Sequence, residues 1–225
     1  MNKTADRRPA QRWPLHRIVK PLVFAACLLP ALHLTAAAFG FAGLSLGTDP
    51  VATLLHTCGR WTLNFLMITL AMTPLRDLTH SLFWLRFRRM FGLFAFFYVL
   101  LHFTVFVLLD QAGKLGALSH EIVKRPYITL GMLGLLLLIP LALTSTAKAQ
   151  RRLGRRWTRL HRLIYVVALL GVWHFWWQVK KDIREPLLYA CGLALLLGYR
   201  IWKQRNAAAA VKPANAAGFA GSDAA

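Results

Sequence analysis

Six stretches without a charged residue constrain this chain more than any other feature of its sequence. They cover residues 21–48, 61–75, 90–109, 126–147, 163–179 and 186–199. A helix that crosses a lipid bilayer needs about 20 mostly apolar residues. With 57% hydrophobic residues and a formal net charge of +20, the chain is unlike a typical soluble domain. The stretches therefore predict a membrane protein built from helices.

Six transmembrane helices are expected, because the two shortest stretches can each be extended across one arginine. The second stretch then includes Arg60, and the last reaches Trp202 if the side chain of Arg200 extends toward the lipid headgroups. The predicted fold class is an all-α membrane protein, a six-helix bundle. Its expected spans are approximately 20–40, 52–74, 90–109, 126–146, 161–178 and 186–202.

The basic residues are divided unevenly between the two ends of these helices. Twenty Lys and Arg lie in the N-terminal, C-terminal and intervening segments on one side, whereas six lie in the opposite loops. Cytoplasmic loops carry the excess of Lys and Arg in membrane proteins, so both termini are expected in the cytoplasm. This division explains most of the positive charge without a nucleic-acid partner, and lipid is the expected surrounding.

The chain is expected to have three parts and no separate soluble domain. Residues 1–19 form a basic cytoplasmic segment, residues 20–203 the transmembrane domain, and residues 204–225 a flexible cytoplasmic tail rich in alanine. The first span is long and is interrupted by Pro30 and His33, which favours a retained helix over a cleaved signal peptide. No internal repeat is recognised.

Two histidines are expected at the same depth in the membrane. His102 lies twelve residues into a helix that begins near 90, and His174 lies thirteen residues into a helix that begins near 161. At 1.5 Å per residue, both are about 18–20 Å from the cytoplasmic end. Two imidazoles facing each other can ligate a haem iron from both sides, although other metals and a structural hydrogen bond are alternatives.

A second site near the cytoplasmic face is less well specified. His161 precedes His174 by thirteen residues, but the corresponding position before His102 is Arg89. His161 can therefore be a second haem ligand or lie beside another cofactor. Arg89 and the neighbouring arginines can bind an anionic group such as a flavin phosphate, or can be ordinary basic loop residues.

His56 and Arg60 lie one helical turn apart in the outer half of the second span. They can pair with a haem propionate or a quinone headgroup, and His56 is an alternative ligand. A structural hydrogen-bond network is an equally good interpretation of this pair.

Several blocks of the sequence, in the same order and spacing, resemble the MsrQ family, also called YedZ. The resemblance covers about residues 45–203. The blocks are LGTDPVATLLHTCGRWTLNFLMITLAMTPLR, RRMFGLFAFFYVLLHFTVFVLLD, KRPYITLG and LTSTAKAQRRLGRRWTRLHRLIYVVALLGVWHFWWQVK. This family is part of the ferric-reductase-like transmembrane group. Members of that group carry paired histidines on two helices, whereas this chain has Arg89 at one of those four places.

The resemblance implies an electron-transfer subunit of an oxidoreductase rather than the catalytic reductase. It implies b-type haem and FMN as cofactors, in the bacterial inner membrane. Electrons from the quinol pool or a cytosolic flavin reductase would reach MsrP, a periplasmic molybdenum-cofactor subunit that reduces methionine sulfoxide in oxidised proteins. The chain has no glycine-rich dinucleotide fingerprint, so direct reduction by NADPH is not expected. The alternatives are a stand-alone ferric or cupric reductase, and a haem-free transporter or assembly factor.

Overall fold

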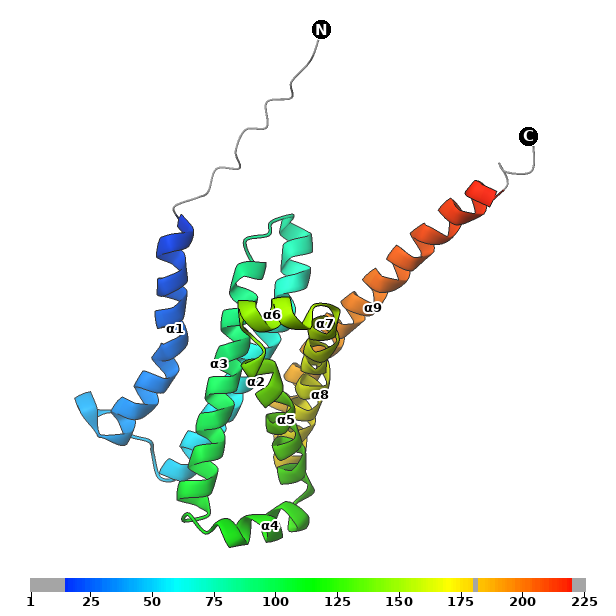
Figure 1. Ribbon diagram of the computed structural model, residues 1–225. Helices are drawn as coiled ribbons and strands as arrows, with labels where there is room; N and C mark the ends of the chain where they lie inside the picture. The colour runs from blue at the N-terminus through cyan, green and yellow to red at the C-terminus, as the bar shows by residue number, and fades with distance from the viewer. Residues whose placement is uncertain (1–14, 180–181, 220–225) are drawn as a thin grey trace. The chain divides into compact units, whose positions relative to one another are not determined.

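The computed structural model describes residues 15–179 and 182–219, and every regular element in these ranges is helical (Figure 1). The contacts divide the chain after Ser45 into two units, and the transmembrane domain expected over 20–203 stays a prediction. The first unit contains α1 (Leu15–Ala38) and the short 3₁₀ helix η1 (Phe41–Gly43). Its apolar part, Ile18–Ala38, is long enough to cross a membrane.

The second unit holds the other helices. Its first helix begins where the sequence supplies a cap: the Asp49 side chain accepts a hydrogen bond from the Ala52 N–H at 2.9 Å, and Pro50 occupies the first turn. The elements are α2 (Pro50–Thr79), α3 (Leu85–Val105), the π-helical turn η2 (Phe106–Asp110), α4 (Leu115–Lys124), α5 (Pro126–Leu143), α6 (Ala147–Leu153), α7 (Arg155–His161), α8 (Leu163–Gln178) and α9 (Arg184–Phe219).

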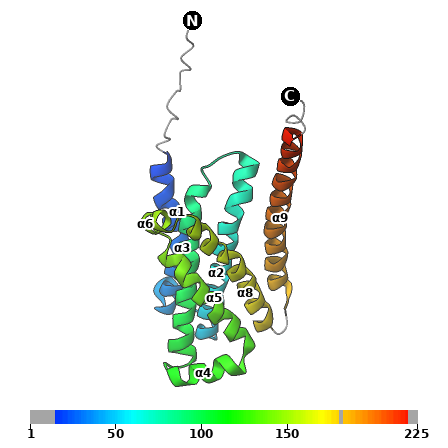
Figure 2. The same cartoon turned by 45° about the vertical axis from the view of Figure 1, so that its right-hand side comes forward.

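Two helix pairs form the body of this unit. Helix α2 packs along α3, and α5 packs along α8, while α3 also contacts α5 and α2 also contacts α8 (Figures 1 and 2). Between α2 and α3 the core is aromatic: Phe65 stacks on Tyr98 with ring centres 5.4 Å apart, and on Phe94 at 5.6 Å. Tyr98 is fully buried, so these rings fix how the two helices lie against each other.

The expected helices are all found, but the number of membrane spans stays a prediction. Within the described residues, four helices are long and apolar enough to cross a membrane: Ile18–Ala38, Leu85–Asp110, Pro126–Leu143 and Arg155–Gln178. Helix α2 is not among them because it carries polar side chains such as His56, Arg60 and Asn64. The apolar run of α9 is short, since charged residues precede residue 186 and follow residue 199. The cytoplasmic placement of the termini is likewise untested.

Two segments differ from the sequence-based expectation. Residues expected to form an outer loop contain α4, which joins the end of α3 to α5. Helix α9 also continues past residue 203 to Phe219, across most of the segment expected to be a flexible tail. The run of alanines from Ala207 to Ala210 explains this continuation, because alanine has the highest intrinsic helix propensity.

A carboxylate attaches α9 to α2 beyond the expected membrane boundary. Asp77 accepts hydrogen bonds from Lys203 Nζ at 2.5 Å and Tyr199 Oη at 3.0 Å, and pairs with Arg76 at 2.7 Å. The hydrogen bond from Lys203, followed by that from Arg76, lowers the pKa of Asp77 below its ordinary value. Because its pKa is lower in the folded than in the unfolded protein, Asp77 stabilises the fold at neutral pH. This contribution is lost as the pH falls through the folded-state pKa.

Asp77→Asn is therefore expected to lower the melting temperature of the detergent-purified protein at pH 7. It should also flatten the decline of that temperature below pH about 4, where an unfolded aspartate begins to take up a proton. The control is Asp182→Asn, since the exposed Asp182 carboxylate accepts from the nearby Arg184 N–H. An unchanged melting temperature for Asp77→Asn at pH 7 would contradict this role.

Candidate cofactor site

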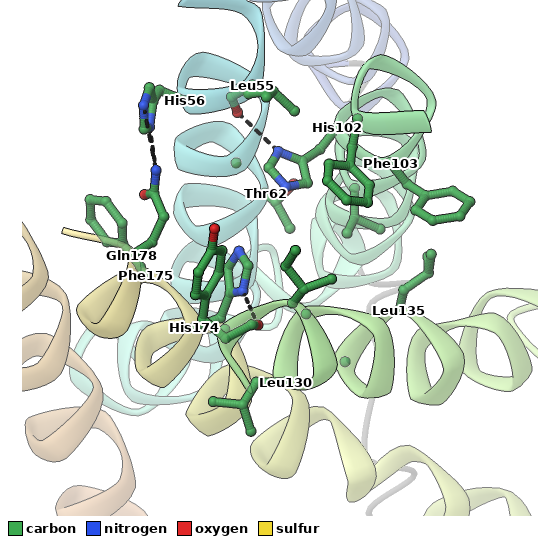
Figure 3. Close-up of a pocket in the computed structure, with 18 of the residues that line it drawn as sticks. Leu55, His56, Thr62, His102, Phe103, Leu130, Leu135, His174, Phe175 and Gln178 are labelled. Atoms are coloured by element: carbon green, nitrogen blue, oxygen red, sulfur yellow. Dashed lines mark hydrogen bonds between the residues drawn. The ribbon is translucent and has the colours of Figure 1, made fainter. Parts of the chain in front are cut away.

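A cavity of about 630 Å³ lies between α2, α3, α5 and α8 (Figure 3). This volume is within the range of about 300–1,000 Å³ that is typical of ligand and cofactor sites. Its wall is largely apolar, and charged residues from both helix pairs line it as well. The apolar lining includes Leu63, Leu66, Val99, Phe103, Phe106, Ile128, Leu135, Leu138, Val167 and Phe175; the charged lining comprises Asp49, Arg60, Asp110 and Arg125.

His102 on α3 lines this cavity and is held by α2. Its Nδ1 atom is 2.9 Å from the backbone carbonyl oxygen of Leu55. A carbonyl oxygen can only accept, so the imidazole nitrogen must donate. The hydrogen bond therefore places the ring proton on Nδ1 and leaves the lone pair of Nε2 available to a metal (Figure 3).

His174 on α8 is held by α5 in the same way. Its Nδ1 atom lies 2.6 Å from the backbone carbonyl oxygen of Tyr127, and the same argument makes Nδ1 the donor. Metal-ligating histidines commonly donate their other ring N–H to a carbonyl, which sets the tautomer and the orientation of the ring. Both histidines thus have the tautomer required for ligation through Nε2.

The spacing of the two rings is suitable for one metal ion between them. Their centres are 6.1 Å apart, and their planes are perpendicular at 90°. A metal–imidazole bond is about 2 Å, and the ring centre lies roughly 1 Å beyond the nitrogen, so two imidazoles on opposite sides of one metal have centres about 6 Å apart. The distance between the His102 and His174 rings is therefore compatible with one metal ion held between them.

His56 and Arg60 also line the cavity, but each has a partner. The Gln178 side-chain nitrogen is 3.4 Å from His56 Nδ1 (Figure 3), and Arg60 forms an ion pair with Glu185 on α9 at 3.3 Å. Both His56 and Arg60 are exposed. The arrangement favours a supporting role at the cavity edge over iron ligation by His56.

Arg125 is a second cation at the cavity that the sequence analysis did not single out. It pairs with Glu121 at 2.8 Å and donates to the Tyr127 hydroxyl at 3.3 Å. The hydrogen bond to Tyr127 raises the pKa of Arg125. Arg60 and Arg125 thus line the cavity from two sides, each paired with a glutamate, beside the carboxylates of Asp49 and Asp110.

His161 and Arg89 do not line this cavity. The His161 Nε2 atom is 3.0 Å from the Thr144 hydroxyl, and its ring stacks on Trp157 with centres 4.0 Å apart. Arg89 is exposed, and Arg88 is the arginine of α3 whose charge acts on His161. The described structure thus brings His102 and His174 together at one cavity. His161 lies apart from them, beside Thr144 and Trp157, and among the described residues Arg89 forms no hydrogen bond with either group.

The sequence matches one known family of membrane proteins. A family model described as "Ferric reductase like transmembrane component" matches residues 58–172, which include α3 and α5 and most of the cavity wall. The match covers more than half of the chain, so the protein is a member of this transmembrane class.

Curated relatives narrow the class. The protein-methionine-sulfoxide reductase heme-binding subunit MsrQ of Xanthomonas campestris pv. campestris (strain 8004) is 58% identical over 163 residues, covering 72% of this chain and 75% of that protein. The MsrQ subunit of Polaromonas naphthalenivorans (strain CJ2) is 44% identical over 195 residues, covering 85% of this chain and 88% of that protein. The chain belongs to the MsrQ family.

Proposed function

We propose that this protein is an inner-membrane electron-transfer subunit that binds one b-type haem between His102 and His174. The observation that carries the proposal is the pair of imidazoles at one cavity, with centres 6.1 Å apart and both Nδ1–H groups donated to backbone carbonyls. The relatives are described as heme-binding subunits, which supports the same cofactor.

The protein's own residues have three tasks in this proposal. The Leu55 and Tyr127 carbonyls orient the imidazoles and keep Nε2 unprotonated. The apolar wall excludes water, and Arg60 and Arg125 would balance the charge of the haem propionates. His102 and His174 would hold the haem, which would supply a one-electron redox centre, and ligation by both imidazoles would suit electron transfer rather than oxygen chemistry.

We infer the direction of electron flow from the MsrQ family resemblance and the charge division. The donor is the quinol pool or a cytosolic flavin reductase, and the acceptor is the periplasmic molybdenum-cofactor subunit MsrP, which reduces methionine sulfoxide in oxidised proteins. The name of the relatives, a subunit of a protein-methionine-sulfoxide reductase, supports such an acceptor. The excess of basic residues on one side supports cytoplasmic termini.

A stopped-flow experiment on the purified subunit tests this function. The haem, reduced anaerobically by a quinol analogue or by flavin reductase with NADH, should be reoxidised when MsrP and a methionine sulfoxide protein are added together. MsrP without the sulfoxide is the control and should accept no more electrons than its own molybdenum centre can hold. Reoxidation at the same rate by chelated Fe(III) or Cu(II), without MsrP, would favour the stand-alone reductase. Purified protein without haem after haem-replete expression would favour the transporter or assembly factor.

We further propose FMN as a second cofactor, near the expected cytoplasmic end. Support comes from the family resemblance and from the basic surroundings of His161, where Arg88 acts on the imidazole and Trp157 stacks against it. An aromatic face next to cationic groups suits an isoalloxazine ring with its phosphate. Arg89, which is exposed, is proposed as an outer contact of that phosphate.

His161→Ala is expected to lower the amount of flavin released by acid from the purified protein while leaving the haem content unchanged. The reason is that His161 lies outside the cavity that contains His102 and His174. Flavin fluorescence and the pyridine haemochrome assay on the same sample measure both cofactors. Loss of half the haem instead would indicate a second haem with His161 as a ligand.

A further inference from the structure

The two histidine sites are built in the same way and are related by one shift along the sequence. In each site the carbonyl that accepts from the imidazole precedes the histidine by 47 positions, and each carbonyl and its histidine lie on the paired helices α2–α3 or α5–α8. One shift of 72 positions relates Leu55 to Tyr127 and His102 to His174. The same shift relates Arg89 to His161.

A glycine stands at the same place in both sites, four residues after the carbonyl. These are Gly59 on α2 and Gly131 on α5, related by the same shift. A residue four positions on lies on the same helix face, one turn further along. Each glycine therefore faces the histidine that donates a hydrogen bond to its own helix. The space between the glycine and the imidazole is given by the distance from a Cβ atom placed on the glycine to the ring.

At Gly131, a Cβ atom would lie 3.0 Å from both Nδ1 and Cε1 of His174. At Gly59, a Cβ atom would lie 3.4 Å from Nδ1 and 3.5 Å from Cε1 of His102. In both places the contact would be with the ring edge that carries the donated proton. A methyl group at Gly131 would thus push the His174 ring away from the carbonyl that orients it, and one at Gly59 would do so more weakly.

We propose that Gly59 and Gly131 are positioning residues, each keeping free the space in which an axial imidazole lies close enough to the neighbouring helix to donate Nδ1–H to the carbonyl one turn earlier. This inference rests on the proposed haem binding and extends it to groups that do not touch the cofactor's iron. Because the donated proton makes the imidazole a stronger base, it favours ferric over ferrous haem and lowers the midpoint potential.

The test compares Gly131→Ala and Gly59→Ala with Gly92→Ala in the full-length, haem-loaded protein. Gly92 on α3 is the matched control: its added Cβ would make an ordinary contact, 3.9 Å from Thr69 Cγ2, and it does not line the cavity. Two quantities are measured for each variant, the haem per chain by pyridine haemochrome and the midpoint potential by redox titration.

Gly131→Ala is expected to reduce haem affinity by about 10–100-fold, the usual effect of disturbing a group behind a metal ligand, and to raise the potential of the haem that remains. Gly59→Ala is expected to keep most of its haem and to show a smaller rise in midpoint potential. If the Gly131→Ala protein cannot be purified, the potential of Gly59→Ala still tests the inference. Gly92→Ala should match the wild type in both quantities.

Wild-type haem content and potential in both Gly131→Ala and Gly59→Ala would overturn the inference and leave the haem proposal intact. An equal loss of haem and rise of potential in Gly92→Ala would also overturn it, since the effect would then be one of general packing. A wild type without haem would instead refute the proposed function itself.

Discussion

His102→Ala and His174→Ala are each expected to remove more than nine tenths of the haem from the purified protein. Each substitution deletes one of the two proposed ligands and leaves part of a largely apolar cavity without its imidazole. Disturbing a group behind a metal ligand already costs about 10–100-fold in affinity, and deleting the ligand itself costs more. The measurement is the ratio of pyridine haemochrome to protein after identical haem-replete expression.

The control for this prediction is another histidine at the same cavity. His56→Ala removes an exposed imidazole whose contact is the Gln178 side chain, so the haem content is expected to stay close to that of the wild type. Any haem retained by His174→Ala should bind carbon monoxide, because one axial position has become open. Full haem occupancy with an unchanged spectrum in both ligand variants would show that His102 and His174 serve packing.

Phe65→Ala is expected to lower the free energy of unfolding by about 3–5 kcal/mol, the usual range for deleting a buried phenylalanine ring. The ring is 2% exposed and contacts the rings of Phe91, Phe94 and Tyr98. No rearrangement of these large rings refills the space easily, so the variant keeps a cavity between α2 and α3. Unfolding of the detergent-solubilised protein by added SDS measures the change.

Phe65→Ala should lower the haem content only in part, although it lowers the free energy of unfolding strongly. Leu55 and His102 sit on the two helices that this aromatic core joins, so some haem should be lost as the helices loosen. Leu136→Ala on α5 is the control, because its side chain is 56% exposed and its loss leaves no internal cavity. Equal stability of the Phe65 and Leu136 variants would contradict the assigned role of the aromatic core.

The proximity of His102 and His174 could be predicted from the sequence, because counting residues from the end of a membrane helix gives the depth of a side chain. Charged residues mark the helix ends, and a rise of 1.5 Å per residue converts a position into a depth. The same counting placed His161 and Arg89 at a common depth near the cytoplasmic end. Depth does not report which helix face a residue occupies, however, and His161 turned out to face Thr144 and Trp157 rather than the cavity.

The groups that orient the imidazoles could not be predicted, since they depend on contacts between helices far apart in the chain. The hydrogen-bond acceptors are the backbone carbonyls of Leu55 and Tyr127, and every residue has such a carbonyl. The side chains of Leu55 and Tyr127 therefore do not mark these positions in the sequence. Gly59 and Gly131 are common residue types whose importance lies in a distance of 3.4 or 3.0 Å to a ring on another helix. The shift of 72 positions that relates them becomes apparent once the two hydrogen bonds are known.

The carbon monoxide sensitivity of the wild-type spectrum tests the central claim most directly. Dithionite-reduced minus oxidised spectra of the purified protein should show a b-type haem at about one per chain by pyridine haemochrome. Carbon monoxide should leave the reduced spectrum unchanged if His102 and His174 both ligate the iron, as proposed. A spectrum shifted by carbon monoxide would contradict ligation by the two histidines, and a protein without haem would contradict the proposed electron-transfer function.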